Sequence, residues 1–282
     1  MSDRTGALDG QVVLVTGGAR GQGRSHAVAA AEAGASIALL DVCADNRTTT
    51  YPLAGPKDLA ETEELVRAVG ADVFSVEVDV SDGPATLDAV ARVRERFGRI
   101  DVLVANAGIH GGGSIQDASL DVWSGVIGTN LSGVFHSMRA VSPIMIEQNY
   151  GRIVATASNQ GRMAVPGSVP YVASKWGVIG LVKAAALDLA QFGITVNAVA
   201  PGNTSTPMVH NDALYKALRP DLESPSWADV EPVLAPHHVQ PVTLLRPEEI
   251  TAAVMFLIGP STPHITGSVI DVNAGSAARY TA

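Results

Sequence analysis

The chain reads VVLVTGGARGQGRSHAVAAAEAG over residues 12–34. Residues 12–16 are apolar or β-branched, as in a buried strand, and a glycine-rich turn leads from them into a stretch long enough for a helix. Gly17 is placed to make the sharp turn out of the strand, and Gly21 and Gly23 carry no Cβ that would keep backbone and helix apart. The helix start then offers free N–H groups and a positive dipole end to a pyrophosphate. This order of strand, glycine-rich turn and helix predicts a dinucleotide site.

The same alternation of short apolar runs and longer stretches repeats along the chain. The runs predicted as strands are 12–16, 36–41, 73–80, 100–105, 152–156, 195–199 and 268–272. The stretches predicted as helices are 21–34, 56–70, 84–98, 120–150, 170–192 and 247–258. Several runs are apolar nearly throughout, as in parallel strands that helices cover on both faces. The order predicts α/β structure: one doubly wound (Rossmann) parallel sheet of about seven strands, in a single domain over 1–282.

The composition limits the classes of protein to which the chain can belong. Of 282 residues, 19 are basic and 28 acidic, and the resulting net charge of −9 repels the phosphate backbone of nucleic acids. The single Cys43 excludes an internal disulfide framework and a cysteine-based metal cluster. Residues 1–10 are not signal-like, and no run of 18 apolar residues occurs. We therefore expect a soluble cytoplasmic protein with no metal, no nucleic-acid partner and no membrane span.

An acidic residue follows the second predicted strand. Asp41 stands 18 residues after Gly23, where its carboxylate can accept hydrogen bonds from a ribose 2′-hydroxyl and repel a 2′-phosphate. Arg20 favours the opposite preference, because a cation in this turn can pair with a 2′-phosphate. The repulsion from Asp41 is the more direct effect, so the sequence favours NAD over NADP. The alternative for Asp41 is a helix cap or a solvated turn residue.

A tyrosine and a lysine stand one helical turn apart in the stretch 170–192. Tyr171 and Lys175 are four residues apart, so both side chains lie on one face of the predicted helix. A phenol titrates near ~10, and a nearby ammonium lowers that pKa. We expect Tyr171 to take a proton from an alcohol, or give one to a ketone, near neutral pH. The alternative is a surface tyrosine beside a solvated lysine.

Other polar residues converge on the carboxyl edge of the predicted sheet. Ser158 follows the fifth strand, 13 residues before Tyr171, where its hydroxyl can hold a substrate oxygen in line with the phenol. Residues 106–108, Asn-Ala-Gly, follow the fourth strand at the same edge, and Asn130 lies in the long stretch after it. The sixth strand leaves through 201–202, Pro-Gly.

Together these motifs resemble the short-chain dehydrogenase/reductase family, and the resemblance covers nearly the whole chain. The matching motifs are 16–23, 79–80, 106–108, Asn130, Ser158, Tyr171, Lys175 and 201–202. The resemblance implies an enzyme that acts on CH–OH groups with a nicotinamide cofactor. It also implies a homotetramer assembled through the helices predicted at 120–150 and 170–192.

The family also implies a role for each matching residue. Tyr171 is the implied general acid/base, Lys175 lowers its pKa and binds the nicotinamide ribose, Ser158 orients the substrate oxygen, and Asn130 holds a water that relays protons. Asp79 and Val80 are expected at the adenine. The complete set implied to contact the cofactor is Gly17, Arg20, Gly21, Gln22, Gly23, Asp41, Asp79, Val80, Asn106, Ala107, Gly108, Tyr171, Lys175, Pro201, Gly202, Thr204 and Thr206.

A narrower resemblance rests on an insertion near 43–57. Asp41 and Asp79 are 38 residues apart, more than is usual in the family. The extra segment, with residues 18–26, resembles the mycofactocin-coupled subgroup typified by carveol dehydrogenases. That resemblance implies a tightly held NAD, reoxidised in place by a peptide-derived carrier, under a flap that folds over the adenosine end. The alternative is an ordinary loop elaboration, since insertions in surface loops have a low cost in free energy.

A second irregular segment, near 203–246, contains six prolines and follows the sixth strand. Because it leaves the carboxyl edge of the sheet, we expect a substrate lid there; a mobile surface loop is the alternative. His110 is expected either to line the substrate pocket or to be packed or solvated, and His237 and His238 are expected to be a solvated pair.

These features predict an NAD-dependent oxidoreductase that interconverts a hydrophobic secondary alcohol and its ketone. Two alternatives remain open. One is a 3-ketoacyl or keto-sugar reductase that exchanges NAD(P)H freely. The other, from a different class of protein, is a cofactor-sensing regulator without catalysis.

Overall fold

Seven parallel strands form one sheet in the order β3-β2-β1-β4-β5-β6-β7. The computed structural model describes residues 6–46 and 48–279. The strands are β1 (Val12–Thr16), β2 (Ser36–Asp41), β3 (Val73–Glu77), β4 (Val102–Ala105), β5 (Gly151–Thr156), β6 (Ile194–Pro201) and β7 (Val269–Val272). The order reverses on either side of β1, which confirms the predicted doubly wound α/β sheet.

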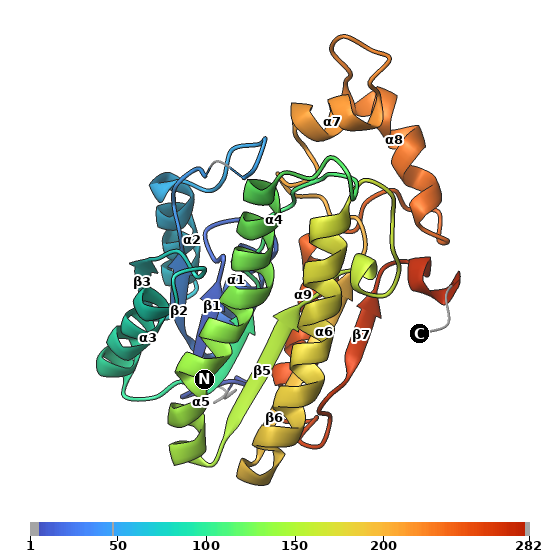
Figure 1. Ribbon diagram of the computed structural model, residues 1–282. Coiled ribbons are helices and arrows are strands. Elements are labelled where there is room, and N and C mark those ends of the chain that lie inside the picture. The colour runs from blue at the N-terminus through green and yellow to red at the C-terminus, as the bar shows by residue number, and fades with distance from the viewer. Residues whose placement is uncertain (1–5, 47, 280–282) are drawn as a thin grey trace.

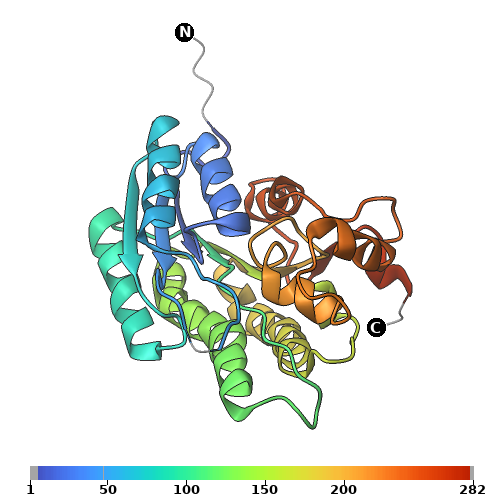
Figure 2. The same ribbon diagram turned by 90° about the horizontal axis from the view of Figure 1, so that it is seen from above.

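Helices cover both faces of the sheet (Figures 1 and 2). The helices are α1 (Gly21–Glu32), α2 (Pro56–Ala68), α3 (Gly83–Phe97), α4 (Leu120–Ile127), α5 (Gly133–Gln148), α6 (Val169–Leu189), α7 (Asp212–Leu218), α8 (Trp227–Leu234) and α9 (Pro247–Ile258). Helices α3, α5 and α6 pack on one face, and α1, α2 and α9 on the other. Short 3₁₀ turns occupy Asn159–Gly161, Ala190–Phe192, Ala235–His237 and Ser276–Arg279. None of the helices in the described residues is both long and apolar enough to cross a bilayer.

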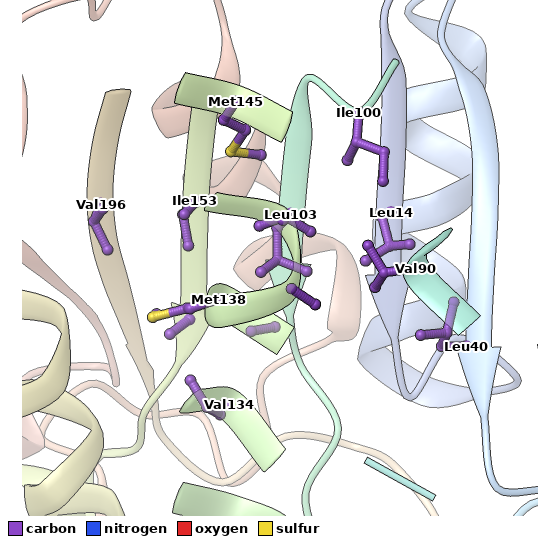
Figure 3. Close-up of a cluster of buried hydrophobic side chains, with 14 of the residues drawn as sticks. Leu14, Leu40, Val90, Ile100, Leu103, Val134, Met138, Met145, Ile153 and Val196 are labelled. Atoms are coloured by element: carbon purple, nitrogen blue, oxygen red, sulfur yellow. The ribbon is translucent and has the colours of Figure 1, made fainter. Parts of the chain in front are cut away.

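Two apolar cores hold these layers together. Side chains alternate along each strand, so Leu14 of β1 points to one face while its neighbours Val13 and Val15 point to the other. On the first face, Leu14 and Leu103 pack with residues of α3 and α5, as Figure 3 shows. Every residue of β1, β4, β5 and β6 is buried, so both faces of these central strands are covered, as expected for largely apolar runs.

Two predicted strands are longer than the observed ones by two residues or more. The run 73–80 ends as a strand at Glu77, because β2 turns away at Cys43, whose φ is 50°, and can offer no further ladder partners. The run 100–105 begins as a strand only at Val102. The backbone N–H and carbonyl of Ile100 are instead paired with the Gln148 side chain, at 3.1 and 2.9 Å.

The single helix predicted over 120–150 is also wrong in detail. A π-helical turn, Gly128–Ser132, separates α4 from α5. Such a turn holds one residue more than an α-helical turn, a feature that the periodicity of a long apolar stretch does not show. Asn130 lies at its centre and is fully buried.

The segment 203–246 is more regular than expected, because it contains α7 and α8. The Asn211 side chain caps α7 by accepting from the Leu214 N–H at 2.8 Å, and Ser226 with Asp229 forms a capping box at α8. A bridge between Thr204 and Leu245 joins the two ends of the segment. The two helices stand above the carboxyl edge of the sheet (Figure 1).

Candidate active site

The glycine-rich turn after β1 forms a tight cradle. Gly17 has a φ of +65°, a left-handed conformation, and its N–H donates to the Leu40 carbonyl at 2.7 Å. A Cβ at Gly23 would lie only 2.0 Å from the Gly17 carbonyl oxygen, so the start of α1 can approach β1 only if residue 23 is a glycine. Gly21 also has a positive φ, +58°. The start of α1, with its free N–H groups, is thereby held at the carboxyl edge of the sheet.

Asp41 lies buried beside this cradle, with 8% of its surface exposed. Its carboxylate accepts hydrogen bonds from the Ala19 N–H at 3.0 Å and the Cys43 N–H at 3.2 Å. Burial raises the pKa of Asp41, while these N–H groups and the charge of Arg20 lower it. The Arg20 guanidinium donates to the Pro52 carbonyl at 2.6 Å.

The other residues expected at the cofactor occupy the same edge. The Gln22 side-chain oxygen is buried and has no hydrogen-bond partner among the described residues. A ligand that donates a hydrogen bond would supply the missing partner. Val80 is buried and accepts a hydrogen bond from His136 Nδ1 at 2.9 Å, whereas Asp79 is exposed and accepts from the Ser81 N–H. A glycine cradle, a buried carboxylate and an unpartnered buried amide oxygen are consistent with a bound dinucleotide.

Residues 106–108 join the ends of β1 and β4. The Asn106 amide donates to the Thr16 and Gly17 carbonyls, both at 3.1 Å, and the Ala107 N–H donates to Thr16 Oγ1 at 3.1 Å. A Cβ at Gly108 would lie 3.5 Å from Lys175 Nζ, so this segment connects the cradle to the catalytic candidates.

Tyr171 and Lys175 share one face of α6, as their spacing predicts. Lys175 Nζ lies 5.6 Å from the centroid of the Tyr171 ring. Lys175 is 3% exposed, and its ammonium donates to the Thr156 carbonyl at 2.8 Å. Ser158 is buried, its hydroxyl donates to Asn159 Oδ1 at 3.1 Å, and it lies close enough to Tyr171 to lower the pKa of that phenol. The phenol, the ammonium and the serine hydroxyl therefore meet where β5 ends.

The pKa values of this pair differ from the expectation. Burial raises the pKa of Tyr171 to about 12, although the hydrogen bond with Ser158 lowers it. Burial also lowers the pKa of Lys175 to about 8. The prediction that Lys175 brings the phenol near neutral pH is therefore wrong for these residues alone. Burial penalises the charged form of both groups, and the ammonium is directed at the Thr156 carbonyl.

Asn130 links the π-helical turn to the rest of the site. Its side-chain oxygen accepts from the Ile109 N–H at 2.8 Å, and its amide nitrogen donates to the Ile109 carbonyl at 2.9 Å and to Ser174 Oγ at 3.2 Å. Ser174 Oγ in turn donates to the Tyr171 carbonyl at 2.7 Å. Both amide protons are thus committed to holding the segment after β4 against α6.

The segment 203–246 begins against the cradle. Pro201 ends β6, and a Cβ at Gly202 would lie 2.5 Å from His238 Nε2. Thr204 is 4% exposed and donates to the Gly202 carbonyl at 3.1 Å. The Thr206 methyl lies 3.4 Å from the position that a Cβ on Gly21 would take, so the segment passes over the glycine-rich turn.

One of the two adjacent histidines is not solvated as expected. His238 is 4% exposed; its Nε2 accepts from the Asn203 N–H at 3.1 Å, and its Nδ1 lies 2.8 Å from the Val242 carbonyl. These partners identify a neutral ring with its proton on Nδ1. His238 is therefore a structural residue of the segment 203–246, whereas His237 is exposed.

The insertion 43–57 reaches further than the adenosine end. It starts at Cys43, a buried thiol whose pKa burial raises to about 12, and Arg47 within it lies outside the described residues. Thr48 Oγ1 lies 2.0 Å from the position that a Cβ on Gly125 of α4 would take. Figure 1 shows the insertion passing from α2 towards α4.

Tyr51, at the far side of the insertion, is a site residue that the sequence analysis did not single out. It is 8% exposed, and its hydroxyl accepts a hydrogen bond from the His110 N–H at 3.0 Å. The His110 ring packs at 5.0 Å from the Tyr171 ring, and its Nε2 lies 3.4 Å from Ser168 Oγ. Burial lowers the pKa of His110. No spacing rule places Tyr51 near His110 and Tyr171, so only the path of the insertion in the structure reveals the hydrogen bond between Tyr51 and His110.

Known proteins match the chain over most of its length. Residues 11–215 match the model of a family described as short chain dehydrogenase. An NAD-dependent oxidoreductase of Mycobacterium tuberculosis is 40% identical over 278 residues, covering 98% of this chain and 99% of the relative. A (−)-trans-carveol dehydrogenase of Rhodococcus erythropolis is 36% identical over 274 residues, covering 95% and 98%. The crystal structure of a carveol dehydrogenase from Mycobacterium avium in complex with NAD superposes with a TM-score of 0.94, at 41% identity, covering 96% of this chain and 99% of that one.

Proposed function

The chain belongs to the short-chain dehydrogenase/reductase family, and on this premise we propose that it is an NAD-dependent oxidoreductase interconverting a hydrophobic secondary alcohol and its ketone. The observation that carries this proposal is the meeting of Tyr171, Lys175 and Ser158 at the end of β5. The preference for a hydrophobic substrate is supported by similarity to relatives named carveol dehydrogenase.

The cradle and Asp41 are the residues proposed to hold NAD. The start of α1 would receive the pyrophosphate, and Asp41 would accept hydrogen bonds from the adenosine ribose. Residues 106–108, Val80 and the strand end at 201–202 would line the remaining length, with Thr204 and Thr206 at the nicotinamide end. NAD held by these residues would supply the acceptor for the hydride of the alcohol carbon.

The chain's own residues orient the substrate and move its proton. In the oxidation direction, the alcohol O–H proton passes to the Tyr171 oxygen while the C–H bond breaks and the carbonyl forms. Ser158, which lies close enough to lower the pKa of the phenol, is proposed to hold the substrate oxygen in place. In the protein alone, burial holds the pKa of Tyr171 at about 12; we propose that with cofactor and substrate in place the Lys175 ammonium favours the phenolate that must exist before the proton arrives. We assign Asn130 to positioning Ile109 and α6, and place the proposed water relay beside it.

Substitution of Tyr171 by Phe tests this assignment. We expect Tyr171→Phe to lower the turnover of secondary alcohols at least about 10³-fold, because the acid/base group is lost. The variant should still bind NAD. Tyr150→Phe, at the other edge of the sheet, is the control and should retain full activity. Near-normal turnover of Tyr171→Phe would refute the proposal.

The insertion supports a second part of the proposal, that NAD is held tightly and reoxidised in place by a mycofactocin-type carrier. Arg20, within the cradle, donates to Pro52 of the insertion at 2.6 Å, so the insertion is tied down beside the cofactor residues. We expect native mass spectrometry of the purified protein to detect retained NAD. Cofactor-free protein that turns over with exchanging nucleotide would instead support the 3-ketoacyl or keto-sugar reductase.

Exposed apolar side chains support the proposed homotetramer. On α4, α5 and α6 these are Leu120, Trp123, Phe135, Trp176 and Leu187. Large exposed apolar side chains gathered on neighbouring helices are typical of a protein interface. Analytical ultracentrifugation should therefore give four times the chain mass of 29.1 kDa. We place this assembly in the cytoplasm, since a chain with the single Cys43 suits a reducing compartment.

A further inference from the structure

The insertion brings a second phenol to the active site. Tyr51 is held from two sides: its hydroxyl accepts from the His110 N–H at 3.0 Å, and the carbonyl of the next residue, Pro52, accepts from Arg20 at 2.6 Å. The Thr49 hydroxyl also donates to the Tyr51 carbonyl at 3.0 Å. With 8% of its surface exposed, the Tyr51 side chain is a fixed part of the interior.

Tyr51 lies close to the proposed catalytic tyrosine. His110, whose backbone binds the Tyr51 hydroxyl, packs its ring at 5.0 Å from that of Tyr171. A charge on Tyr51 would raise the pKa of Tyr171, so the two phenols are within electrostatic reach. Among the described residues no hydrogen bond joins the two hydroxyls.

The hydrogen bonding of the Tyr51 hydroxyl is incomplete. A phenol oxygen accepts hydrogen bonds and also carries one proton to donate. The acceptor side is used by His110, but no acceptor for the proton is found in the part of the chain that the structure describes. Burial raises the pKa of Tyr51, so the proton stays on the oxygen at neutral pH. Buried donors in folded proteins normally have a partner, which indicates that a ligand supplies this one.

We propose that Tyr51 is a specificity-determining residue whose hydroxyl donates to a second oxygen of the substrate. This inference rests on the proposed function, in which Ser158 and Tyr171 serve the oxygen that reacts. The preferred substrates are then secondary alcohols and ketones that carry a further hydroxyl or carbonyl group. An apolar substrate without that oxygen would leave the Tyr51 proton unpaired, and discrimination against it follows.

The experiment compares cyclohexanol with its three positional diols. The readout is the single-turnover reduction of NAD in the holoenzyme, followed by nicotinamide absorbance, so no reoxidising partner is needed. We expect the wild type to oxidise at least one diol with kcat/KM about tenfold above that of cyclohexanol. Tyr51→Phe keeps the ring, removes the hydroxyl, and should abolish this tenfold preference while cyclohexanol stays within about twofold; a tenfold ratio corresponds to about 1.4 kcal/mol.

The control variant is Tyr150→Phe, whose hydroxyl lies 3.4 Å from Gln11 Oε1 at the opposite edge of the sheet. It should leave both kcat/KM values unchanged. An equal loss for cyclohexanol and the diols in Tyr51→Phe would mean that Tyr51 only anchors the insertion, and it overturns the inference.

Two further outcomes separate this inference from the function on which it rests. If Tyr51→Phe does not fold, the wild-type comparison decides alone, and the absence of any preference for a diol overturns the inference. If the wild type oxidises cyclohexanol without preferring a diol, only the role of Tyr51 fails. If no alcohol in the panel or in a wider set of terpenoid alcohols reduces the bound cofactor, the proposed function fails and the role of Tyr51 with it.

Discussion

The Lys175 ammonium lies 5.6 Å from the centroid of the Tyr171 ring and donates to the carbonyl of Thr156, the last residue of β5. One bond thus ties α6 to the sheet at the point where the phenol and Ser158 meet. Because burial lowers the pKa of Lys175 to about 8, the charge of this group is sensitive to its immediate partners.

Removal of that ammonium should impair the chemistry. We expect Lys175→Met to lower kcat/KM for a secondary alcohol about 10²-fold or more, since the phenolate loses its nearest cation and the Thr156 carbonyl loses its donor. Single-turnover kinetics measure this. Lys183→Met, an exposed residue on the same helix, is the matched control. A similar loss in both variants would contradict the role of Lys175.

Substitution in the glycine cradle should abolish cofactor binding. A Cβ at Gly23 meets the Gly17 carbonyl oxygen at 2.0 Å, so Gly23→Ala must push α1 away from β1. Isothermal titration with NAD should show no binding, or the protein should not fold. Gly180→Ala adds its methyl group where no atom lies within 4 Å, and by helix propensity it should stabilise the protein by about 1 kcal/mol. Normal NAD affinity in Gly23→Ala would disprove the placement of the cradle.

The choice of nucleotide should depend on Asp41. We expect Asp41→Asn to weaken NAD binding about tenfold, because a charged acceptor for the ribose becomes neutral. The same change should improve the binding of NADP, since the repulsion of its 2′-phosphate is gone. Titrations of wild type and variant with both nucleotides give the ratio of the dissociation constants for NADP and NAD. If this ratio is the same in both proteins, the adenosine ribose does not bind at Asp41.

Stability at acid pH should depend on His26. Burial lowers its pKa to about 3, against about 6.5 in an unfolded chain. The unfolded state therefore binds the extra proton between these values, and the free energy of unfolding should fall as the pH drops from about 6.5 towards 3. Urea titrations at several pH values measure this slope. The change in the free energy of unfolding per pH unit should be smaller in His26→Gln than in the wild type. If both proteins show the same slope, His26 does not cause the loss of stability at acid pH.

Much of the fold and of the site is predictable because local sequence carries it. Glycines at 17, 21 and 23 are required by close backbone approach, and the period of four between Tyr171 and Lys175 fixes a shared helix face. These features depend only on residues close together in the chain. The alternation of apolar runs and helices predicts the doubly wound parallel sheet, whereas the order of its strands is known only from the structure.

The features that could not be predicted depend on contacts between distant segments. The π-helical turn holds Asn130 against Ile109. The pKa of Tyr171 rises because that residue is buried. His238 is buried within the segment 203–246, where it accepts a hydrogen bond from the Asn203 N–H. Tyr51 reaches the active site only through the path of the insertion. The caps of α7 and α8, at Asn211 and at Ser226 with Asp229, are local in sequence, but no helix is predicted over 203–246.

The π-helical turn Gly128–Ser132 offers a way to change the active site without changing the rest of the fold. A turn of this kind is one residue longer than its α-helical equivalent. We expect that deletion of one residue from this turn would let α4 and α5 continue as a single regular α-helix. The Asn130 side chain would then no longer form its hydrogen bonds with Ile109. Such a deletion should therefore impair catalysis while the sheet and its helices still fold.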